Sequence, residues 1–553
     1  MNKISMEKET EKELLQEVEN LKAQVKKLKA RKKYGLVWDA EKEPEKVVLD
    51  CRKKLPILVE EKEKEIMGKE GEPVNLLIKG DNYHSLTALN YTHKGKIDLI
   101  YIDPPYNQGK AKEWLYNDHF VDSNDNYRHS KWLNLMEKRL TLAKNLLSNQ
   151  GLIFISIDDY EVGTLKLLCD EIFGENNFFA NLTWINRTKP KNMGEARFNI
   201  QQNVEYVLVY GKNNMSCFSR FVLRELAGKK YPYKDDEGKN YRLELISQRK
   251  NVGRLRRDTM LFPVLGINPR DGFRWQMSKE KYSSLKENNR IKIIDSKLYE
   301  LIYDFEEESF SYSPYWSHLL DAGTAEDGKK QLSDALGKSH EFETVKPINL
   351  IKEILFHYPF KKEGGIVLDF FAGSGTTGQA IAELNQKDGV KRKFILCTNN
   401  EGDIFDNICY PRLKNIFEKQ KNNLISGNIK CYKTDFVETE NLDNATDQDK
   451  IELTYKIGEM IAMREETFEE IEKDDWWQIF SNGKEVTAIY FKEDKSKLQK
   501  LVEKLDKMCK KANLYIFSWG KNEYANEFTE YKKIKVKDIP EPLIEVYKEV
   551  ANI

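Results

Sequence analysis

The stretch "GIVLDFFAGSGTTGQAIAEL" (365–384) decides the fold class, because it passes from a strand through a glycine turn into a helix. An apolar run precedes Asp369, and three glycines follow it: Gly373, Gly375 and Gly378. Glycine permits a tight turn and a close approach of the backbone to a ligand, and the N–H groups at a helix N-terminus suit an anionic group. The stretch therefore predicts a strand–loop–helix unit with a ligand at the loop. It matches the dinucleotide pattern GxGxxG in letters, which alone is weak, and close helix packing is the alternative.

Strand and helix patterns alternate on both sides of this unit. An amphipathic helix is predicted over 130–151, ending at Gly151, and another over 346–358. Buried strands are predicted at "NLLIKG" (75–80), "KIDLIYID" (96–103), "LIFISID" (152–158), "VEYVLVYGK" (204–212) and "KFILCTNN" (393–400). This alternation predicts an α/β fold with a parallel, doubly wound sheet.

Length and composition place limits on the function. The chain has 553 residues, which predicts about two to four domains. Lys+Arg and Asp+Glu are both 90, so a nucleic-acid contact requires a local basic patch. The seven cysteines include no CxxC pair, which argues against a disulfide framework or a structural zinc site. Since no signal-peptide h-region or long apolar run occurs, we expect a reduced, soluble, cytoplasmic protein.

A second motif lies in "DLIYIDPPYNQGK" (98–110). Asp103 is the first residue after a predicted strand, at the edge where open α/β sheets place their ligands. The Asp103 carboxylate and the Pro104 carbonyl can both accept hydrogen bonds from one amino group. Tyr106 can place its ring parallel to a planar heterocycle. The motif therefore predicts a receptor for the exocyclic amine of a flat base, and the alternative is a rigid Pro-Pro turn with a capping Asp.

Together, Asp-Pro-Pro-Tyr (103–106) and Phe-Ala-Gly-Ser-Gly (371–375) resemble the motifs of the amino-group DNA methyltransferases. Their order, with the catalytic motif first, is similar to the circularly permuted beta class. Flanking segments resemble the modification (Mod) subunits of type III restriction-modification systems, and the likeness covers roughly residues 34–430. These segments are residues 33–66, "LIKGDNYHSL" (77–86), "FISIDDYEV" (154–162) and "FILCTNNEGD" (394–403) with the later "YPRLKNI".

The resemblance implies a Rossmann-like, S-adenosylmethionine-dependent fold with a mostly parallel sheet, an inserted target-recognition region and a small α+β C-terminal domain. It also implies site-specific methylation of N6 of a flipped-out adenine, with S-adenosylmethionine as cofactor and no metal. The implied partners are double-stranded DNA, a second copy of the chain and a helicase-nuclease restriction subunit, with no membrane.

Carried over by position, the resemblance assigns a catalytic set: Asp103, Pro104, Pro105 and Tyr106. It assigns a cofactor set: Asp81, Lys346, Asp369, Phe371, Gly373, Gly375, Thr376, Asn399 and Glu401. Two departures are visible. Asp369-Phe370-Phe371 stands where the family often has Asp-Pro-Phe. The ribose-binding acid is absent from its usual place, where Asn399 and Asn400 stand, with Glu401 one step further.

Two basic clusters are candidate DNA contacts, because arginines suit both phosphates and guanine edges. The first lies within 186–198 and contributes Arg187, Lys189, Lys191 and Arg197. The second lies within 247–258 and contributes Arg249, Lys250, Arg254, Arg256 and Arg257. The alternative for each cluster is a solvated charged loop.

The predicted organisation has five parts. An N-terminal helix (1–33) carries an a/d seam, which favours a short coiled coil or, alternatively, a solvated helix packed on its own domain. A catalytic half (34–212), a target-recognition region (213–312) and a cofactor half (313–435) follow. The last part (440–553) contains a β-α-β pattern and is a candidate docking domain.

Other functions stay open at this point. The same fold serves cytosine-N4 and RNA methyltransferases, and Asp rather than Ser at 103 favours adenine. A catalytically weak, DNA-binding regulatory subunit is a second alternative. A dinucleotide-dependent oxidoreductase is a third, but it leaves Asp-Pro-Pro-Tyr unexplained.

Overall fold

The computed structural model describes most of the chain after residue 45. The described residues are 46–51, 53–68, 71–108, 128–189, 200–219, 221–225, 230–304, 310–319, 321–342, 344–419, 427–439, 445–508, 511–520, 524 and 527–551. Contacts divide the chain into two compact units, Met1–Ser219 with Trp316–Ile553 and Arg220–Tyr315. The helix predicted over 1–33 lies outside the described residues.

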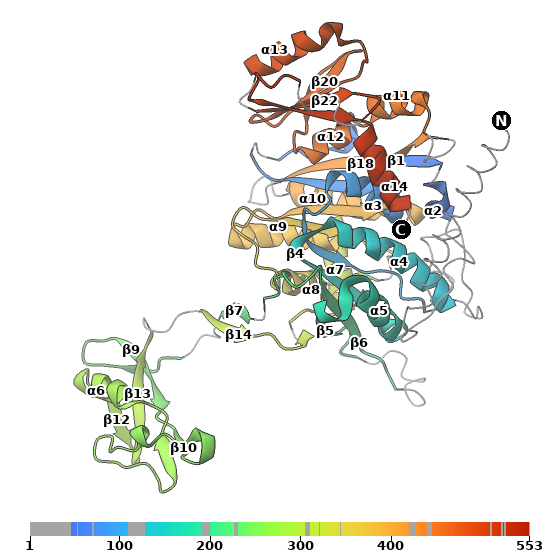
Figure 1. The fold of residues 1–553 in the computed structure, drawn as a ribbon. Coiled ribbons are helices and arrows are strands. Elements are labelled where there is room, and N and C mark those ends of the chain that lie inside the picture. The colour runs from blue at the N-terminus through green and yellow to red at the C-terminus, as the bar shows by residue number, and fades with distance from the viewer. Residues whose placement is uncertain are drawn as a thin grey trace, which may run out of the picture. The chain divides into compact units, whose positions relative to one another are not determined.

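A large mixed sheet forms the centre of the first unit (Figure 1). The order of its strands among the described residues is β1 (Lys54–Glu60), β18 (Asn428–Glu438), β2 (Val74–Lys79), β17 (Lys393–Thr398), β16 (Ile366–Asp369), β3 (Ile97–Ile102), β4 (Leu147–Ile157), β6 (Val204–Gly211), β5 (Phe178–Ile185) and β15 (His318–Leu319). The strands from β18 through β4 are parallel. The predicted α/β fold is confirmed, and β3 lies beside β16 although β16 comes much later in the chain.

Two details of the predicted sheet were wrong. The helix predicted to reach Gly151 is α4 (Arg128–Leu146), and β4 begins at once at Leu147. Ser148, Asn149, Gln150 and Gly151 follow Leu147. Ser, Asn and Gly are poor helix formers, and the strand accommodates this segment with a register shift opposite β3. Strand β6 is antiparallel to both β4 and β5, since no helix occurs between β5 and β6 in the described part of that connection.

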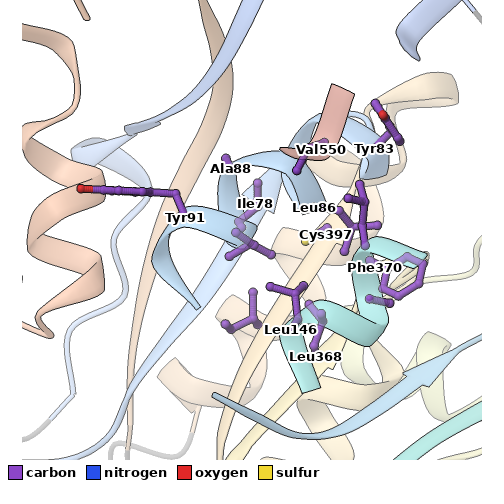
Figure 2. Packing of buried hydrophobic residues seen from close by; sticks show 14 of the residues in the cluster. Ile78, Tyr83, Leu86, Ala88, Tyr91, Leu146, Leu368, Phe370, Cys397 and Val550 are labelled. Carbon is purple, nitrogen blue, oxygen red and sulfur yellow. The ribbon is translucent and has the colours of Figure 1, made fainter. Parts of the chain in front are cut away.

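Helices cover both faces of the sheet. One face packs against α3 (Asn82–Thr92), α4 and α5 (Val162–Cys169), and Figure 2 shows Leu368 and Cys397 of this face near Leu146 and Leu86 of the helices. The other face packs against α8 (Ile348–Leu355), α9 (Thr376–Asp388) and α10 (Tyr410–Lys419). The short α2 (Lys46–Asp50) and α7 (Ala325–Leu336) complete this part. None of the described helices is long and apolar enough to cross a membrane.

The C-terminal residues form a second, smaller sheet. Its order is β19 (Glu469–Lys473), β20 (Trp477–Ser481), β21 (Val486–Tyr490), β22 (Ala512–Phe517) and β23 (Ile534–Ile539). Strands β21 and β22 are parallel and flank α13 (Leu498–Met508), which gives the predicted β-α-β pattern. Helices α11 (Asp447–Lys456), α12 (Gly458–Arg464) and α14 (Glu541–Ala551) contribute side chains to the core that lies under α3 and α4. The C-terminal sheet is therefore anchored to the larger sheet through a shared core.

The second unit, Arg220–Tyr315, is built from short strands around a small core. Its described strands form a sheet of order β12 (Ile291–Ile294), β13 (Lys297–Tyr303), β9 (Asn240–Leu245) and β8 (Tyr233–Lys234), and two pairs, β10 (Gln248–Lys250) with β11 (Phe273–Trp275) and β7 (Phe221–Glu225) with β14 (Phe310–Pro314). One helix, α6 (Lys279–Glu287), packs on a core that includes Trp275 and Leu285. Such short elements carry little periodicity, and residues 213–312 accordingly show no long periodic pattern in the sequence.

Candidate active site

The two predicted motifs lie at one edge of the central sheet. Strands β3 and β16 are hydrogen-bonded neighbours, with Leu368 opposite Ile100. Because the two strands are parallel, the residues that follow them, Asp103 and the loop after Asp369, emerge at the same edge. The sequence places these loops far apart in the chain, and the sheet brings them side by side.

The Asp-Pro-Pro-Tyr turn is held from both flanks. The indole nitrogen of Trp132 on α4 donates to the Pro105 carbonyl at 2.7 Å. Asn107, with a left-handed φ of 57°, donates from Nδ2 to Oε1 of the fully buried Glu161 at 2.5 Å. No hydrogen bond to the Pro104 carbonyl occurs among the described residues. The turn is therefore fixed in place by contacts from α4 and from Glu161.

Within the described part of the chain, two side chains donate to the Asp103 carboxylate. The Tyr106 hydroxyl donates to Oδ1 at 2.7 Å, and Lys346 Nζ donates to Oδ1 and Oδ2 at 2.7 and 2.8 Å. Lys346 is 5% exposed and comes just before α8. The sequence assigned Lys346 to the cofactor, whereas the structure brings it to Asp103, and the cofactor contact stays a prediction.

Glu205 is a member of the site that the sequence analysis missed. It lies at the start of β6 and is 9% exposed. Its Oε2 accepts a hydrogen bond from the Tyr106 hydroxyl at 3.0 Å and lies 3.3 Å from Lys346 Nζ. Its Oε1 accepts from Asn186 Nδ2 at 2.8 Å. An acid directly before the apolar strand "YVLVYG" was the available signal, because a strand that enters a core rarely begins with an unpaired carboxylate.

Electrostatics keep the basic and phenolic groups of this cluster protonated. Burial by itself lowers the pKa of Lys346, but the Asp103 and Glu205 carboxylates outweigh burial and raise that pKa above its usual value. Burial, followed by the same two carboxylates, raises the pKa of Tyr106 well above its ordinary range. Lys346 is therefore an ammonium ion and Tyr106 a neutral hydroxyl donor at neutral pH.

The loop after β16 is organised around Asp369. Its Oδ1 accepts from the Phe371 backbone N–H at 3.0 Å, and its Oδ2 accepts from the Thr377 hydroxyl at 2.6 Å. Burial raises the pKa of Asp369 to about 7. The loop has left-handed backbone at Gly373 (φ 48°) and Gly375 (φ 77°), where other residues are strained. Asp369 thus shapes the glycine turn that opens α9.

Arg412 on α10 was also missed by the sequence analysis. It is fully buried, and its Nη1 donates to Oγ of Ser374 at 3.1 Å and to Oγ1 of Thr376 at 2.8 Å. Its Nε donates to Gln379 at 2.8 Å. Burial lowers the pKa of Arg412 only to about 10, so the guanidinium stays charged. Arg412 therefore fastens the glycine loop, while the predicted site residue Phe371 packs in the core beside Phe370.

The ends of β17 and β2 carry the other predicted cofactor residues. Asn399 donates from Nδ2 to Glu401 at 3.1 Å, but its buried Oδ1 has no hydrogen-bond partner among the described residues. Asp81 caps α3 by accepting from the Tyr83 N–H at 2.7 Å. A buried acceptor without a partner is costly, and it suits a hydroxyl-bearing ligand beside the glycine loop. The residues present therefore fit a nucleoside cofactor at this edge.

The predicted DNA-contact residues are exposed wherever they are described. Arg187 and Lys189 follow β5 at the edge that carries Asp103, and Lys191 and Arg197 lie outside the described residues. The other cluster belongs to the second unit and consists of Arg249, Lys250, Arg254, Arg256 and Arg257. Arg256 is ion-paired with Asp258 at 3.0 Å. The first cluster therefore belongs to the first unit, and the second cluster to the second unit.

Within the described ranges, no group of three or more His, Cys, Asp or Glu side chains could hold a metal ion.

The chain is similar to known DNA-modifying proteins. A family model described as DNA methylase matches residues 97–404. The StyLTI type III Mod subunit of Salmonella typhimurium is 33% identical over 374 residues, which cover 63% of this chain and 55% of that protein. The type II methyltransferase M.KpnI of Klebsiella pneumoniae is 32% identical, covering 60% and 82% of the two chains. The chain thus spans little more than half the length of the Mod subunit. The solved PvuII cytosine-N4 DNA methyltransferase is 12% identical with a TM-score of 0.34, covering 65% and 98%.

Proposed function

The chain belongs to the DNA methylase family, and from that premise we propose that it methylates N6 of a specific adenine in double-stranded DNA with S-adenosylmethionine. Two acceptors at the turn after β3 carry the proposal, namely the Asp103 carboxylate and the Pro104 carbonyl, to which no described residue donates. They lie beside the glycine loop, on the neighbouring strand of the same sheet edge. An adenine amine held by the Asp103 turn would thus lie next to S-adenosylmethionine held by the glycine loop.

The turn activates the amine by its geometry. Adenine N6 is a poor nucleophile because its lone pair is delocalised into the ring. When Asp103 and the Pro104 carbonyl accept its two N–H bonds, N6 is drawn toward tetrahedral geometry and the lone pair localises. Aligned reacting groups gain roughly 7–11 kcal/mol over free encounter. The Asp103 carboxylate also stabilises the positive charge that develops on N6.

S-adenosylmethionine, when bound, supplies an electrophilic methyl group on a sulfonium. The glycine loop, shaped by Asp369 and fastened by Arg412, would hold its anionic end. The unpartnered Oδ1 of Asn399 would accept from a ribose hydroxyl, in place of the usual acid. Glu401 orients the Asn399 amide by accepting from it. Asp81, just after the end of the next strand, would flank the nucleoside.

Double-stranded DNA presents its adenine amine inside the base stack, so the target base must be flipped out, which costs a few kcal/mol. The Tyr106 ring would replace part of the lost stacking. Arg187 and Lys189 lie at the catalytic edge and would contact phosphates there. The basic residues of the second unit would read the sequence. Similarity to a type III Mod subunit supports action together with a separate restriction subunit, and a homodimer is part of the proposal.

Expression of this chain alone in a host without adenine methylation tests the proposal. Long-read sequencing of the host DNA identifies both the modified base and its sequence context. We expect N6-methyladenine at one short motif, and none when the expressed chain carries Asp103→Ala. N4-methylcytosine at a motif would show that the target base is cytosine and contradict the adenine assignment. Unmodified DNA from a host that contains the stably folded chain would refute methylation.

A further inference from the structure

We propose that Lys346 occupies the position of the target amine when no base is bound, and that Glu205 receives Lys346 when the base enters. The inference rests on the proposed function, because it deepens the role of the Asp103 turn. It makes Glu205 a positioning residue that acts through Lys346. The site then has two states: a closed state in which Lys346 is paired with Asp103, and an open state in which Lys346 is paired with Glu205 and Asp103 holds the base.

Lys346 Nζ makes the contacts that the target amine requires. It donates to both oxygens of Asp103 at 2.7 and 2.8 Å, and it lies 4.9 Å from the centre of the Tyr106 ring. An exocyclic amine that is held by Asp103, on a base stacked against Tyr106, needs the same space. The ammonium and the amine cannot bind the carboxylate in the same place, so Lys346 must move before the base is held.

A buried ammonium needs a second counter-ion if it leaves the first. Lys346 is 5% exposed, so water does not solvate its ammonium. Separation from Asp103 would therefore leave an unpaired buried charge, which is strongly unfavourable. Glu205 Oε2 already lies 3.3 Å from Nζ. The Asn186 amide and the Tyr106 hydroxyl hold that carboxylate in position. A short movement of Nζ therefore exchanges Asp103 for Glu205 while Lys346 stays charged and paired.

The charge count of the cluster supports this exchange. Among the described residues, the two carboxylates of Asp103 and Glu205 lie beside the Lys346 ammonium, so these three groups together carry one negative charge in excess. Once Lys346 is paired with Glu205, the Asp103 carboxylate is left to balance the charge that develops on the amine. Without Glu205, the ammonium and Asp103 would form a neutral pair that a neutral amine has little power to displace.

The substitution Glu205→Gln tests the inference, because glutamine can still accept from Asn186 but cannot neutralise Lys346. It is combined with Lys346→Met in a double-mutant cycle. Two quantities are measured for each variant. The first is kcat/KM for tritiated-methyl transfer to unmethylated DNA, and the second is affinity for a duplex that contains the sequence motif at which the wild type methylates. The melting temperature reports on folding, and cofactor affinity, measured by tryptophan fluorescence, reports on whether Glu205→Gln disturbs the cofactor site.

We expect Glu205→Gln to lower kcat/KM for DNA at least about tenfold when Lys346 is present, and less than about twofold in the Lys346→Met background. Duplex affinity should follow the same pattern, and Glu205→Gln should leave cofactor affinity unchanged. A penalty of equal size in both backgrounds would make Glu205 merely structural. If Glu205→Gln lowered neither kcat/KM nor duplex affinity in the protein that retains Lys346, the inference would also be overturned.

The Lys393–Glu466 pair is the matched control. Its ammonium and carboxylate lie 2.8 Å apart, but Lys393 is at the opposite end of β17 from the site. Glu466→Gln should change neither activity nor duplex affinity. If the wild-type chain methylates DNA but the cycle shows no coupling, the exchange fails while the proposed function stands. A wild-type chain that folds and binds cofactor but transfers no methyl group refutes both.

Discussion

Two aspartates follow neighbouring strands at the same sheet edge, and they are satisfied in different ways. Each carboxylate oxygen of Asp369 accepts a hydrogen bond from a residue close in the chain, one from the Phe371 backbone N–H and the other from the Thr377 hydroxyl. Asp103 is satisfied by long or aromatic side chains, and one of them, Lys346, comes from a segment 243 residues away. The first carboxylate is part of the scaffold. The second is held by groups that can be exchanged for a ligand.

The contrast gives a general way to separate scaffold from site among buried acids. A carboxylate bonded to adjacent backbone cannot release its partners without unfolding the loop. A carboxylate bonded to mobile side chains can exchange them at the expense of a shift in rotamer. Sequence position alone does not make the distinction, because both residues are the aspartate at a strand end.

The largest expected effect comes from comparing Asp103→Ala with Asp369→Ala. Asp103→Ala should reduce methyl transfer at least about 100-fold, because the amine loses its charged acceptor, while cofactor affinity stays near wild type. Asp369→Ala should weaken cofactor binding and lower the melting temperature, because two buried donors lose their acceptor. Labelled-methyl transfer, cofactor titration and thermal melts distinguish the two. Equal loss of cofactor binding in both variants would make Asp103 a structural residue.

The protonation of Asp369 gives a second test, through the pH dependence of stability. Its pKa is raised from near 4 when unfolded to about 7 when folded. The folded state therefore binds the extra proton, and stability should fall as pH rises from about 4 to about 7. The Asp369→Asn variant has no titratable group at this position, so its stability does not contain this pH-dependent contribution. The melting temperature of the wild type relative to Asp369→Asn should therefore fall across that window and level off above it, whereas a constant difference would contradict burial of the carboxyl.

A smaller effect is expected from Arg412, which fastens the glycine loop at the start of α9. Arg412→Lys should weaken cofactor binding about tenfold, because one ammonium cannot contact Ser374, Thr376 and Gln379 together. Arg392→Lys is the matched control, since Arg392 is also buried but pairs with Asp388 at the far end of α9. Both variants should melt at lower temperature. If Arg392→Lys weakened cofactor binding equally, the effect would belong to helix packing rather than to the loop.

The smallest effect is expected in the second unit. Arg249→Ala removes an exposed basic side chain on β10 and should weaken DNA binding. If Arg249 contacts one phosphate, the slope of log K against log salt should fall by about 0.9. Lys281→Ala is the control, because Lys281 is already paired with Glu300 at 2.8 Å. An unchanged slope for Arg249→Ala would remove that residue from the DNA interface.

The sequence predicted the features that depend on local pattern. Apolar runs that end in Asp103 and Asp369 marked two strand ends, and the parallel alternation placed those ends at one edge. It could not supply contacts between residues that are distant in the chain. Glu205 and Arg412 look like an ordinary strand residue and an ordinary helix residue until the fold brings them to the two loops.

The remaining gaps have a similar origin. The contact between Lys346 and Asp103 was not predicted, because which partner a long side chain contacts depends on packing, and the assignment of Lys346 to the cofactor stays a prediction. The antiparallel strand β6 was not anticipated, because a hydrophobic run does not reveal its direction. The start of β4 was missed because the apolar pattern of α4 continues through Leu147.

The most direct test of the account is whether Asp103 grips the target amine. The measurement is the affinity of wild type and Asp103→Ala for two duplexes, one with adenine and one with purine, which lacks the amine, at the methylated position. We expect purine to weaken wild-type binding about tenfold or more and to have little effect on Asp103→Ala, a coupling of at least about 1.4 kcal/mol. Equal losses in the two proteins would show that Asp103 does not contact the amine.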